Sequence, residues 1–121
     1  MAIQDPLSER VIGCAWTIQR TLGCGFLEKV YENAMVHECR KAALSVVAQH
    51  PIRVIYDGIV VGEFAADLLV EGRLLVELKT VKTLDDIHLA QCLNYLKATG
   101  LKVCLLLNFG KPDLEIRRVV L

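Results

Sequence analysis

Three charged residues interrupt an apolar stretch in the middle of the chain: Asp67, Glu77 and Lys79. Glu77 and Lys79 are two residues apart in a run typical of a strand, so their side chains project from the same face. An unpaired charge within a sheet is costly unless it forms an ion pair or binds a metal. The three residues therefore indicate either a chemical site, a buried Glu–Lys pair or an edge strand that faces water.

Whether Asp67 joins the other two depends on the register of the predicted hairpin. Directly paired residues of an antiparallel hairpin share a face, and residue 67 pairs with residue 77 if a three-residue connection, 71–73, joins the strands. A two-residue turn at Glu71-Gly72 would pair residue 67 with residue 76 and separate the carboxylates. We predict the three-residue connection, because loops of this length that contain glycine are a known hairpin class. It also predicts one wholly apolar face, formed by Phe64, Ala66, Leu68, Val70, Leu74, Val76 and Leu78.

Two carboxylates and an ammonium group on one surface are suited to a divalent cation. Mg²⁺ and Mn²⁺ prefer hard oxygen ligands, and they typically use one or two protein carboxylates together with water and substrate phosphate oxygens. Such an ion lowers the pKa of a bound water and polarises a phosphoryl oxygen, which favours in-line attack on a phosphodiester. No serine lies in a Gly-x-Ser-x-Gly segment, so a serine nucleophile is not expected.

The segment after the hairpin carries a polar stripe. His88, Gln91 and Tyr95 stand at positions i, i+3 and i+7, on one face of a predicted helix. A solvated or internally satisfied helix face is the plainer interpretation, and for His88 alone we favour it. Gln91 and Tyr95 directly follow the Asp/Glu-x-Lys hairpin, which favours a role in the same site. Among the scattered cations, which usually form only a solvated surface, Lys82 is the candidate for a phosphate contact.

The motifs in this order resemble a known family. Asp67 followed after nine residues by Glu77-x-Lys79 resembles the PD-(D/E)XK nuclease superfamily, and the helical Gln91-x-x-x-Tyr95 is similar to the QxxxY motif of its RecB-type members. Residues 25–32 contain Gly-x-x-Glu-x-x-Tyr, which resembles the small GxxExxY proteins of that superfamily. The acidic motif alone is short and degenerate, whereas all three motifs in order are specific. The chain departs from the superfamily pattern at Ala66, where the motif has proline.

The resemblance implies a metal-dependent phosphodiesterase site and the acidic residues that form it. Asp67 and Glu77 would bind the divalent ion, Mg²⁺ or Mn²⁺. Glu28, from an earlier helix, would be the additional acidic residue and a third metal ligand. A plainer interpretation of Glu28 is that it belongs, with Lys29 and Glu32, to the wet side of an amphipathic helix.

The resemblance also implies roles for the residues that are not acidic. Lys79 would orient the attacking water or stabilise negative charge on the phosphate. Gln91 would position Lys79 or the substrate backbone. We assign Tyr95, Lys82 and His88 to substrate binding.

Helical periodicity predicts two helices before the strands. The first begins at Asp5-Pro6 and ends at Gly23-Cys24-Gly25, and the second covers residues 27–43. After residue 51 the apolar period becomes two, which predicts strands over 52–56, 59–70 and 74–79 with a hairpin turn at Asp57-Gly58. Thr83 and Asp86 resemble a capping box for a helix that runs to residue 99, before Gly100. Strands over 102–108 and 114–121 complete the chain.

This order, two helices, three strands, a helix and two strands, predicts an α/β fold. Strands 64–70 and 74–78 are apolar on both faces, so helices must cover a mixed sheet from both sides. The resemblance implies the same arrangement, a restriction-endonuclease-like core. No repeat, low-complexity tract or linker marks a boundary, so we interpret residues 1–121 as a single domain.

Composition narrows the classes of protein further. The 121 residues include 14 basic and 14 acidic side chains, which excludes a globally basic nucleic-acid binder but leaves a local basic site open. No apolar run approaches the roughly 20 residues of a membrane-spanning helix. The N-terminus lacks the pattern of a secretory signal, so we expect no membrane and a cytoplasmic location.

Cysteine usage and apolar content bear on redox state and assembly. The five cysteines include no Cys-x-x-Cys pair, which argues against disulfides, zinc and iron–sulfur clusters and predicts buried thiols. Apolar residues and glycine together exceed the roughly 45–50 % usual in soluble domains. We therefore expect a buried subunit interface and a homo-oligomer, in the simplest case a dimer.

Three hypotheses about function follow. The first is a Mg²⁺-dependent nuclease that acts on nucleic acid, with DNA expected before RNA. The second is a nucleic-acid-binding or interaction module that keeps the nuclease fold with little or no hydrolytic activity. The third is a purely structural oligomer subunit, in which the carboxylates of Glu28, Asp67 and Glu77 do not converge.

Overall fold

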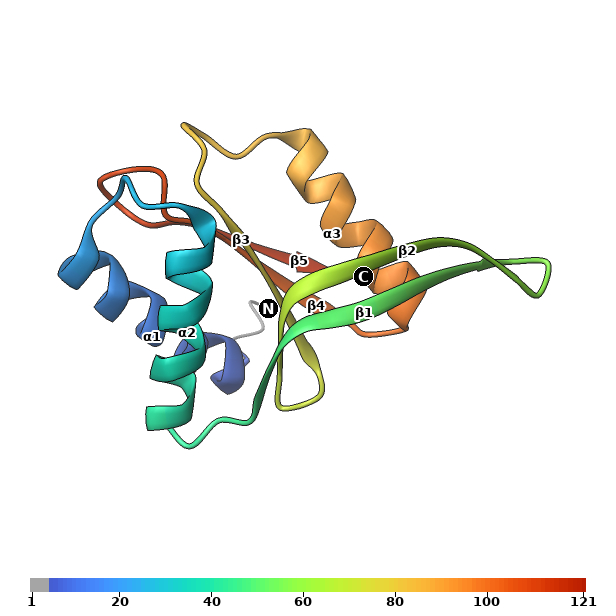
Figure 1. Ribbon diagram of the computed structural model, residues 1–121, viewed down its shortest axis with the longest axis horizontal. Coiled ribbons are helices and arrows are strands. Elements are labelled where there is room, and N and C mark those ends of the chain that lie inside the picture. Colours follow the sequence, from blue (N-terminus) through green and yellow to red (C-terminus); the bar gives the residue numbers. More distant parts are fainter. Residues whose placement is uncertain (1–4) are drawn as a thin grey trace.

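The computed structural model describes residues 5–121, which form three layers (Figure 1). Helices α1 and α2 lie on one face of a five-stranded sheet, and α3 lies on the other. The order of elements is the predicted one. Their bounds are α1 Pro6–Leu22, α2 Glu28–Lys41, β1 Val46–Tyr56, β2 Ile59–Val70, β3 Leu74–Lys79, α3 Asp86–Thr99, β4 Val103–Asn108 and β5 Glu115–Val120.

The sheet is mixed, as predicted, with the strand order β1-β2-β3-β4-β5. The first three strands form an antiparallel meander, and β4 and β5 form a second antiparallel pair. β3 and β4 are parallel, which requires a crossover connection, and α3 supplies it. The restriction-endonuclease-like α/β architecture expected from the sequence is therefore confirmed.

Local signals explain how α1 and α3 begin and end. The Asp5 carboxylate accepts the N–H of Leu7 at 3.1 Å, and proline at the first position of α1 needs no hydrogen-bond partner there. Helix α3 ends at Gly100, whose φ of 77° is the left-handed conformation that glycine adopts without strain. Both signals act as predicted.

Two predicted boundaries are wrong. β1 begins at Val46 rather than at residue 52, and Pro51 lies within it because β1 is an edge strand and needs donors on one side only. The cap of α3 is Asp85, not Thr83. The Asp85 carboxylate accepts the N–H of Ile87 at 3.0 Å, and His88 Nδ1 accepts the N–H of Asp85 at 3.0 Å.

The sheet separates two hydrophobic cores, one under α1 and α2 and one under α3. Leu68 and the alternate apolar residues of β3 belong to the first core, as predicted. Ala66 instead lies in the second core, and the Phe64 ring centroid is 5.9 Å from that of Tyr95 on α3. The predicted single apolar face is therefore wrong beyond Asp67, because the alternation of β2 reverses at that residue.

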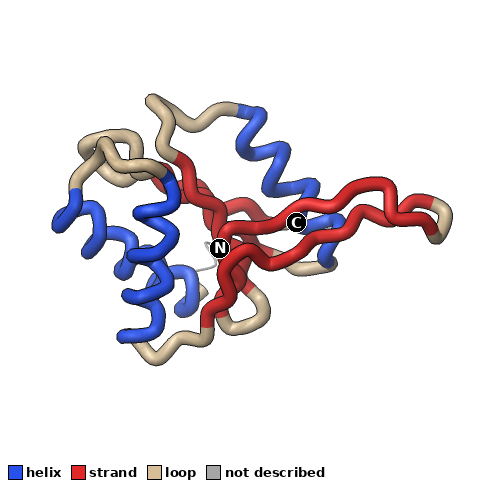
Figure 2. The backbone as a smooth tube through the Cα atoms, in the orientation of Figure 1, coloured by secondary structure: helices blue, strands red, loops and turns tan. Residues whose placement is uncertain are grey.

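Beyond this reversal, β1 and β2 continue as a two-stranded ribbon that projects past the rest of the sheet (Figure 2). We call residues 53–64 the arm. Its turn is the predicted one, with Asp57 and Gly58 at φ values of 57° and 77°. Such paired positive values are typical of the tight turns that match the twist of a hairpin.

All five cysteines are free thiols. Four are buried as predicted, but Cys24 is exposed, because it lies in the loop between α1 and α2. No helix in the described part of the chain is long and apolar enough to span a membrane.

A hydrogen-bond network around Asn108 fixes the segment that follows β3. Asn108 is fully buried; its amide nitrogen donates to the Val81 carbonyl at 2.9 Å and its amide oxygen accepts the Val81 N–H at 3.0 Å. The same oxygen accepts the N–H of Gly110 at 2.9 Å. A Cβ at Gly110 would lie 2.7 Å from the carbonyl carbon of Thr80 and closer still to Val81, so only glycine fits.

We expect Gly110→Ala to lower the free energy of unfolding by about 1–3 kcal/mol, because backbone rather than a flexible side chain occupies the space. Gly13→Ala is the matched control. Gly13 lies within α1 with no atom near its absent Cβ, so alanine there should stabilise by about 0.5–1 kcal/mol. Urea unfolding of both variants measures the two effects, and an unchanged midpoint in Gly110→Ala would contradict the close packing.

Candidate active site

The candidate site lies where β2 separates from β3. The two strands pair only at Leu68↔Val76, Leu69↔Leu75 and Val70↔Leu74, across the three-residue connection 71–73. The predicted register is therefore confirmed, and it sets Asp67 opposite Glu77. Backbone pairing stops just before these two residues.

Asp67 and Glu77 replace the missing backbone pairing with their own side chains. The N–H of Asp67 donates to Glu77 Oε2 at 2.8 Å, and the N–H of Leu78 donates to Asp67 Oδ2 at 2.7 Å. Each carboxylate thus bonds to the opposite strand through one oxygen. The two acidic side chains are held side by side at the point where the strands part.

Lys79 is connected to α3 through the side-chain amide of Gln91. Its Nζ donates to Gln91 Oε1 at 3.1 Å, and Gln91 Nε2 donates to the hydroxyl of Tyr95 at 3.1 Å. The i, i+4 spacing of Gln91 and Tyr95 allows this contact along one helix face. The structure therefore brings together Lys79 and both residues of the predicted Gln-x-x-x-Tyr motif.

Glu28 enters the site from the first residue of α2. The loop before it is fixed by Tyr31, whose buried hydroxyl donates to the Gly23 carbonyl at 2.6 Å. The Tyr31 ring also stacks on Phe109 at a centroid distance of 4.5 Å. The tyrosine of the Gly-x-x-Glu-x-x-Tyr motif thus anchors the turn from which Glu28 projects.

The two remaining candidates lie in or after the loop between β3 and α3. His88 uses Nδ1 in the cap of α3, where it accepts the N–H of Asp85. Burial, followed by repulsion from Asp67, raises the pKa of Glu28, and His88 is the weakest of the groups that affect it. Lys82 is exposed in the loop after β3, with no contact to the other candidates among the hydrogen bonds and ion pairs of residues 5–121. His88 therefore borders the site, and Lys82 is not brought into it.

All three acidic candidates resist ionisation. Burial, followed by repulsion from Asp67, raises the pKa of Glu77 to about 8. Burial also raises the pKa of Asp67, although the Leu78 N–H opposes the rise. The pKa of Glu28 is raised by desolvation and next by Asp67, although its side chain is largely exposed. Repulsion from Asp67 contributes to the raised pKa of both Glu28 and Glu77, so the three carboxylates lie within electrostatic reach of one another.

The donor set fits a hard divalent cation. Carboxylate oxygens are the ligands that Mg²⁺ and Mn²⁺ prefer, and the repulsion among these groups is what a bound cation would relieve. Hydrogen bonds to the opposite strand use one oxygen each of Asp67 and Glu77. Within the described residues no three acidic, histidine or cysteine side chains form a closed metal cluster as they stand. Binding would therefore draw Glu28 toward the pair on β2 and β3.

Two further residues border this site and were not among the predicted ones. Glu32, one helical turn after Glu28, is buried and accepts a hydrogen bond from Gln49 Nε2 at 2.6 Å. Repulsion from Glu32 contributes to the raised pKa of Asp67. The i, i+4 spacing of two glutamates was the available signal for Glu32. The sequence held no comparable signal for Gln49, because the position of its side chain near the site depends on a backbone conformation that the sequence pattern does not indicate.

The raised pKa of Glu77 predicts a pH dependence of stability. A carboxyl whose folded-state pKa lies above its unfolded value stabilises the fold fully below the unfolded pKa, and this contribution is lost as the pH rises through about 8. Glu77→Gln, which stays neutral, should raise the free energy of unfolding of the metal-free protein at pH 9 by about 3–5 kcal/mol, and far less at pH 5.

Urea unfolding at the two pH values measures this difference. Glu63→Gln on the exposed arm serves as the control and should change little at either pH. An equal effect of Glu77→Gln at pH 5 and pH 9 would show that Glu77 is not the group that titrates.

Comparison with solved structures finds the same fold in an alkaline exonuclease from Laribacter hongkongensis. The two structures superpose with a TM-score of 0.56, over 97 % of this chain and 72 % of that chain. Their sequences are 16 % identical, so the likeness concerns the fold alone. None of the curated proteins matches the sequence.

Comparison with protein families agrees with the motifs. The model of the PD-(D/E)XK nuclease superfamily matches residues 5–119. This range includes the acidic pair, Lys79 and the helix that carries Gln91. Nucleases of this superfamily generally use divalent metal ions. The chain thus belongs to the PD-(D/E)XK nuclease superfamily.

Proposed function

We propose that the protein is a metal-dependent nuclease that hydrolyses phosphodiester bonds of nucleic acid, with DNA as the expected substrate. The observation that carries the proposal is the interlocked pair of Asp67 and Glu77 beside Lys79. Two carboxylates with raised pKa values next to a fixed ammonium group favour a site for a cation and a phosphate.

Each residue then has a definite role. Asp67, Glu77 and Glu28 hold Mg²⁺ or Mn²⁺, which when bound supplies an activated water and polarises a phosphoryl oxygen. Lys79 orients the water or stabilises the negative charge that develops on the phosphate. Gln91 holds the Lys79 ammonium group through the 3.1 Å hydrogen bond from Nζ.

The residues that we assign to substrate binding lie at the edge of the site formed by the acidic residues and Lys79. Tyr95 fixes the Gln91 amide through its hydroxyl, so its effect on substrate passes through Gln91. His88 lies beside Glu28, and Lys82 extends from the loop after β3 toward solvent. We assign His88 and Lys82 to contacts with the substrate backbone.

The Gly-x-x-Glu-x-x-Tyr segment supports assignment to the GxxExxY group of the superfamily. Tyr31 anchors the loop that presents Glu28, which gives the spacing of this motif a physical reason.

We further propose, as the sequence predicts, that residues 1–121 act as a single domain and that the protein is cytoplasmic.

Purified protein should cleave DNA in the presence of Mg²⁺ or Mn²⁺, and chelation should abolish cleavage. Asp67→Asn and Lys79→Met should each lower the rate by about 100-fold or more, since each removes a charge from the reacting centre. Asp113→Asn, in an exposed loop, is the matched charge control and should cleave at the wild-type rate.

Two outcomes would contradict the nuclease. Equal cleavage by wild type and both site variants would identify a contaminant. Nucleic acid retained by the wild-type protein, with no Mn²⁺ binding in calorimetry and no cleavage, would favour the alternative, a binding module that keeps the fold.

We also propose that two copies of the chain associate through the arm. Its exposed side chains include Ile55, Tyr56, Ile59, Val60, Val61 and Phe64. A two-stranded ribbon is marginally stable in water, so an apolar arm requires a partner. Its charged residues, Arg53, Asp57 and Glu63, do not form the basic surface that nucleic acid requires.

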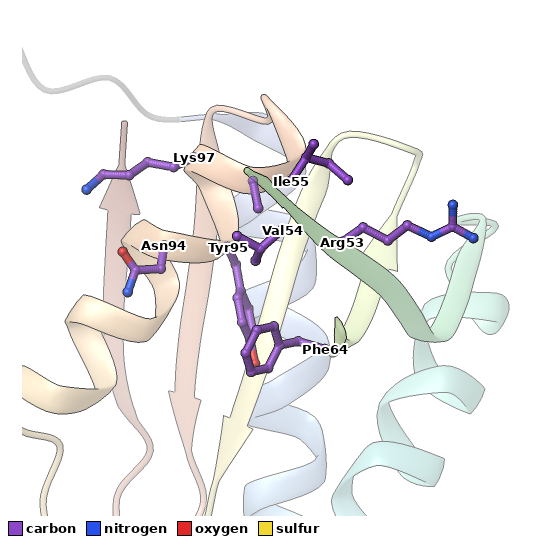
Figure 3. A pocket seen from close by; sticks show the side chains of 8 residues that line it. Arg53, Val54, Ile55, Phe64, Asn94, Tyr95 and Lys97 are labelled. Atoms are coloured by element: carbon purple, nitrogen blue, oxygen red, sulfur yellow. The ribbon is translucent and has the colours of Figure 1, made fainter. Parts of the chain in front are cut away.

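A groove between the arm and α3 offers the complementary surface (Figure 3). Phe64 and Tyr95 lie in it, and Arg53 and Lys97 project from its two sides. The tip of a second arm carries Asp57 among apolar residues, so its charge is opposite to that of the groove rim. Reciprocal insertion of the two tips gives a closed, two-fold arrangement.

Sedimentation should give a dimer for the wild type and a monomer for Asp57→Lys and for Lys97→Asp. The double variant Asp57→Lys/Lys97→Asp should recover the dimer, because exchange of the two charges restores their attraction. Lys102→Asp, away from the groove, is the control. A monomeric wild type, or a double variant no better than the single ones, would refute this arrangement.

A further inference from the structure

Gln49 lies opposite Asp67 across the β1–β2 ladder. The flanking pairs, Ala48↔Leu68 and His50↔Ala66, remain in one register, yet residues 49 and 67 do not pair. The backbone is therefore distorted at this one position without the insertion of a residue. It is the same position at which β2 reverses its faces and leaves β3.

The distortion lies in the backbone of Gln49, whose φ is +56°. A side chain with a Cβ is strained in this left-handed region. Asp57 has nearly the same φ, 57°, but there the hairpin turn requires it. Gln49 lies within a strand, where no turn explains the conformation, so contacts of its side chain must favour it.

One such contact runs to α2. Gln49 Nε2 donates to Glu32 Oε1 at 2.6 Å, and Lys29 Nζ contacts Glu32 Oε2 at 2.6 Å. Both oxygens of this buried carboxylate are thus engaged. Glu32 is therefore an anchor for the Gln49 amide rather than a free ligand for a cation.

The second neighbour of the Gln49 amide is Asp67, which lies directly opposite Gln49 across the β1–β2 ladder. A primary amide has two N–H donors, so one can remain on Glu32 while the other faces Asp67. The amide is thus tied to α2, which carries Glu28, at a position opposite Asp67 on β2.

We propose that Gln49 is a positioning residue: its amide, anchored on Glu32, holds the Asp67 carboxylate in the orientation that a divalent cation requires. The left-handed backbone of Gln49 is retained because it brings the amide between the two carboxylates. The inference rests on the proposed metal-dependent function. Beyond that function, we infer that the separation of Glu28 and Asp67 is fixed by Gln49, a residue that binds neither cation nor substrate.

Mn²⁺ titration by calorimetry and metal-free thermal unfolding test the proposal together. Gln49→Ala and Gln49→Gly both remove the amide, so both should weaken Mn²⁺ binding by about tenfold or more. Glycine relieves the strain and alanine does not, so Gln49→Gly should unfold about 3–5 °C above Gln49→Ala. A purely structural role predicts that glycine, which keeps the backbone, restores Mn²⁺ affinity.

A double-variant cycle tests the path through Glu32. Glu32→Ala should weaken Mn²⁺ binding as much as Gln49→Ala, and the two changes together should weaken it no further, because they break one bridge. Ala43→Gly is the control for strain alone: φ at Ala43 is 60°, so glycine should raise the unfolding temperature and leave Mn²⁺ affinity unchanged.

The outcomes separate this inference from the proposed function. Wild-type affinity in Gln49→Ala and Gln49→Gly, with DNA cleavage intact, would overturn the role of Gln49 and leave the nuclease standing. Additive losses in the cycle would overturn the anchor on Glu32. A wild-type protein that neither binds Mn²⁺ nor cleaves DNA would overturn the proposed function and this inference with it.

Discussion

The site depends on how the chain satisfies two backbone donors where β2 leaves β3. Once pairing stops after Leu68↔Val76, the N–H groups of Asp67 and Leu78 have no carbonyl partner on the neighbouring strand. Buried donors without acceptors are costly, and here two carboxylates accept instead. The acidic pair therefore has a structural reason to exist beside its chemical one. Because each carboxylate uses one oxygen for the backbone, the bonds orient both groups.

The rest of the fold fixes what surrounds this pair. Tyr31 packs on Phe109 and bonds the Gly23 carbonyl, which connects the loop before α2 to the loop after β4. Asn108, one residue before Phe109, binds both backbone groups of Val81 just after Lys79. Glu28 and Lys79 thus come from segments braced by two adjacent residues, Asn108 at the end of β4 and Phe109 just after it. Such bracing accounts for the distribution of the motifs over nearly the whole chain, since residues far apart in sequence must be held within one small volume.

Much of this arrangement was predictable because it follows from periodicity and chain direction. The register of β2 and β3 could be predicted from the three-residue, glycine-containing connection 71–73, and the α3 stripe from helical spacing. The reversal of β2 at Asp67 was not predictable, because the alternation rule assumes an unbroken strand. The sequence placed Glu32 on the solvated side of its helix, and nothing in it distinguished Gln49. Their contact joins α2 to β1 and depends on a left-handed φ, which no local pattern encodes for glutamine.

Costs to stability concentrate around the acidic pair. Raised pKa values oppose ionisation of Glu77, Asp67 and Glu28, and the strained backbone of Gln49 lies directly opposite Asp67. The proposed cation would offset the repulsion among the carboxylates, and the strain at Gln49 is of the kind found at functional sites. The neutral formal charge of the chain then describes the metal-free protein only. If three carboxylates are neutralised by a cation, basic side chains outnumber the remaining acidic ones, and the molecule becomes more attractive to a phosphate backbone.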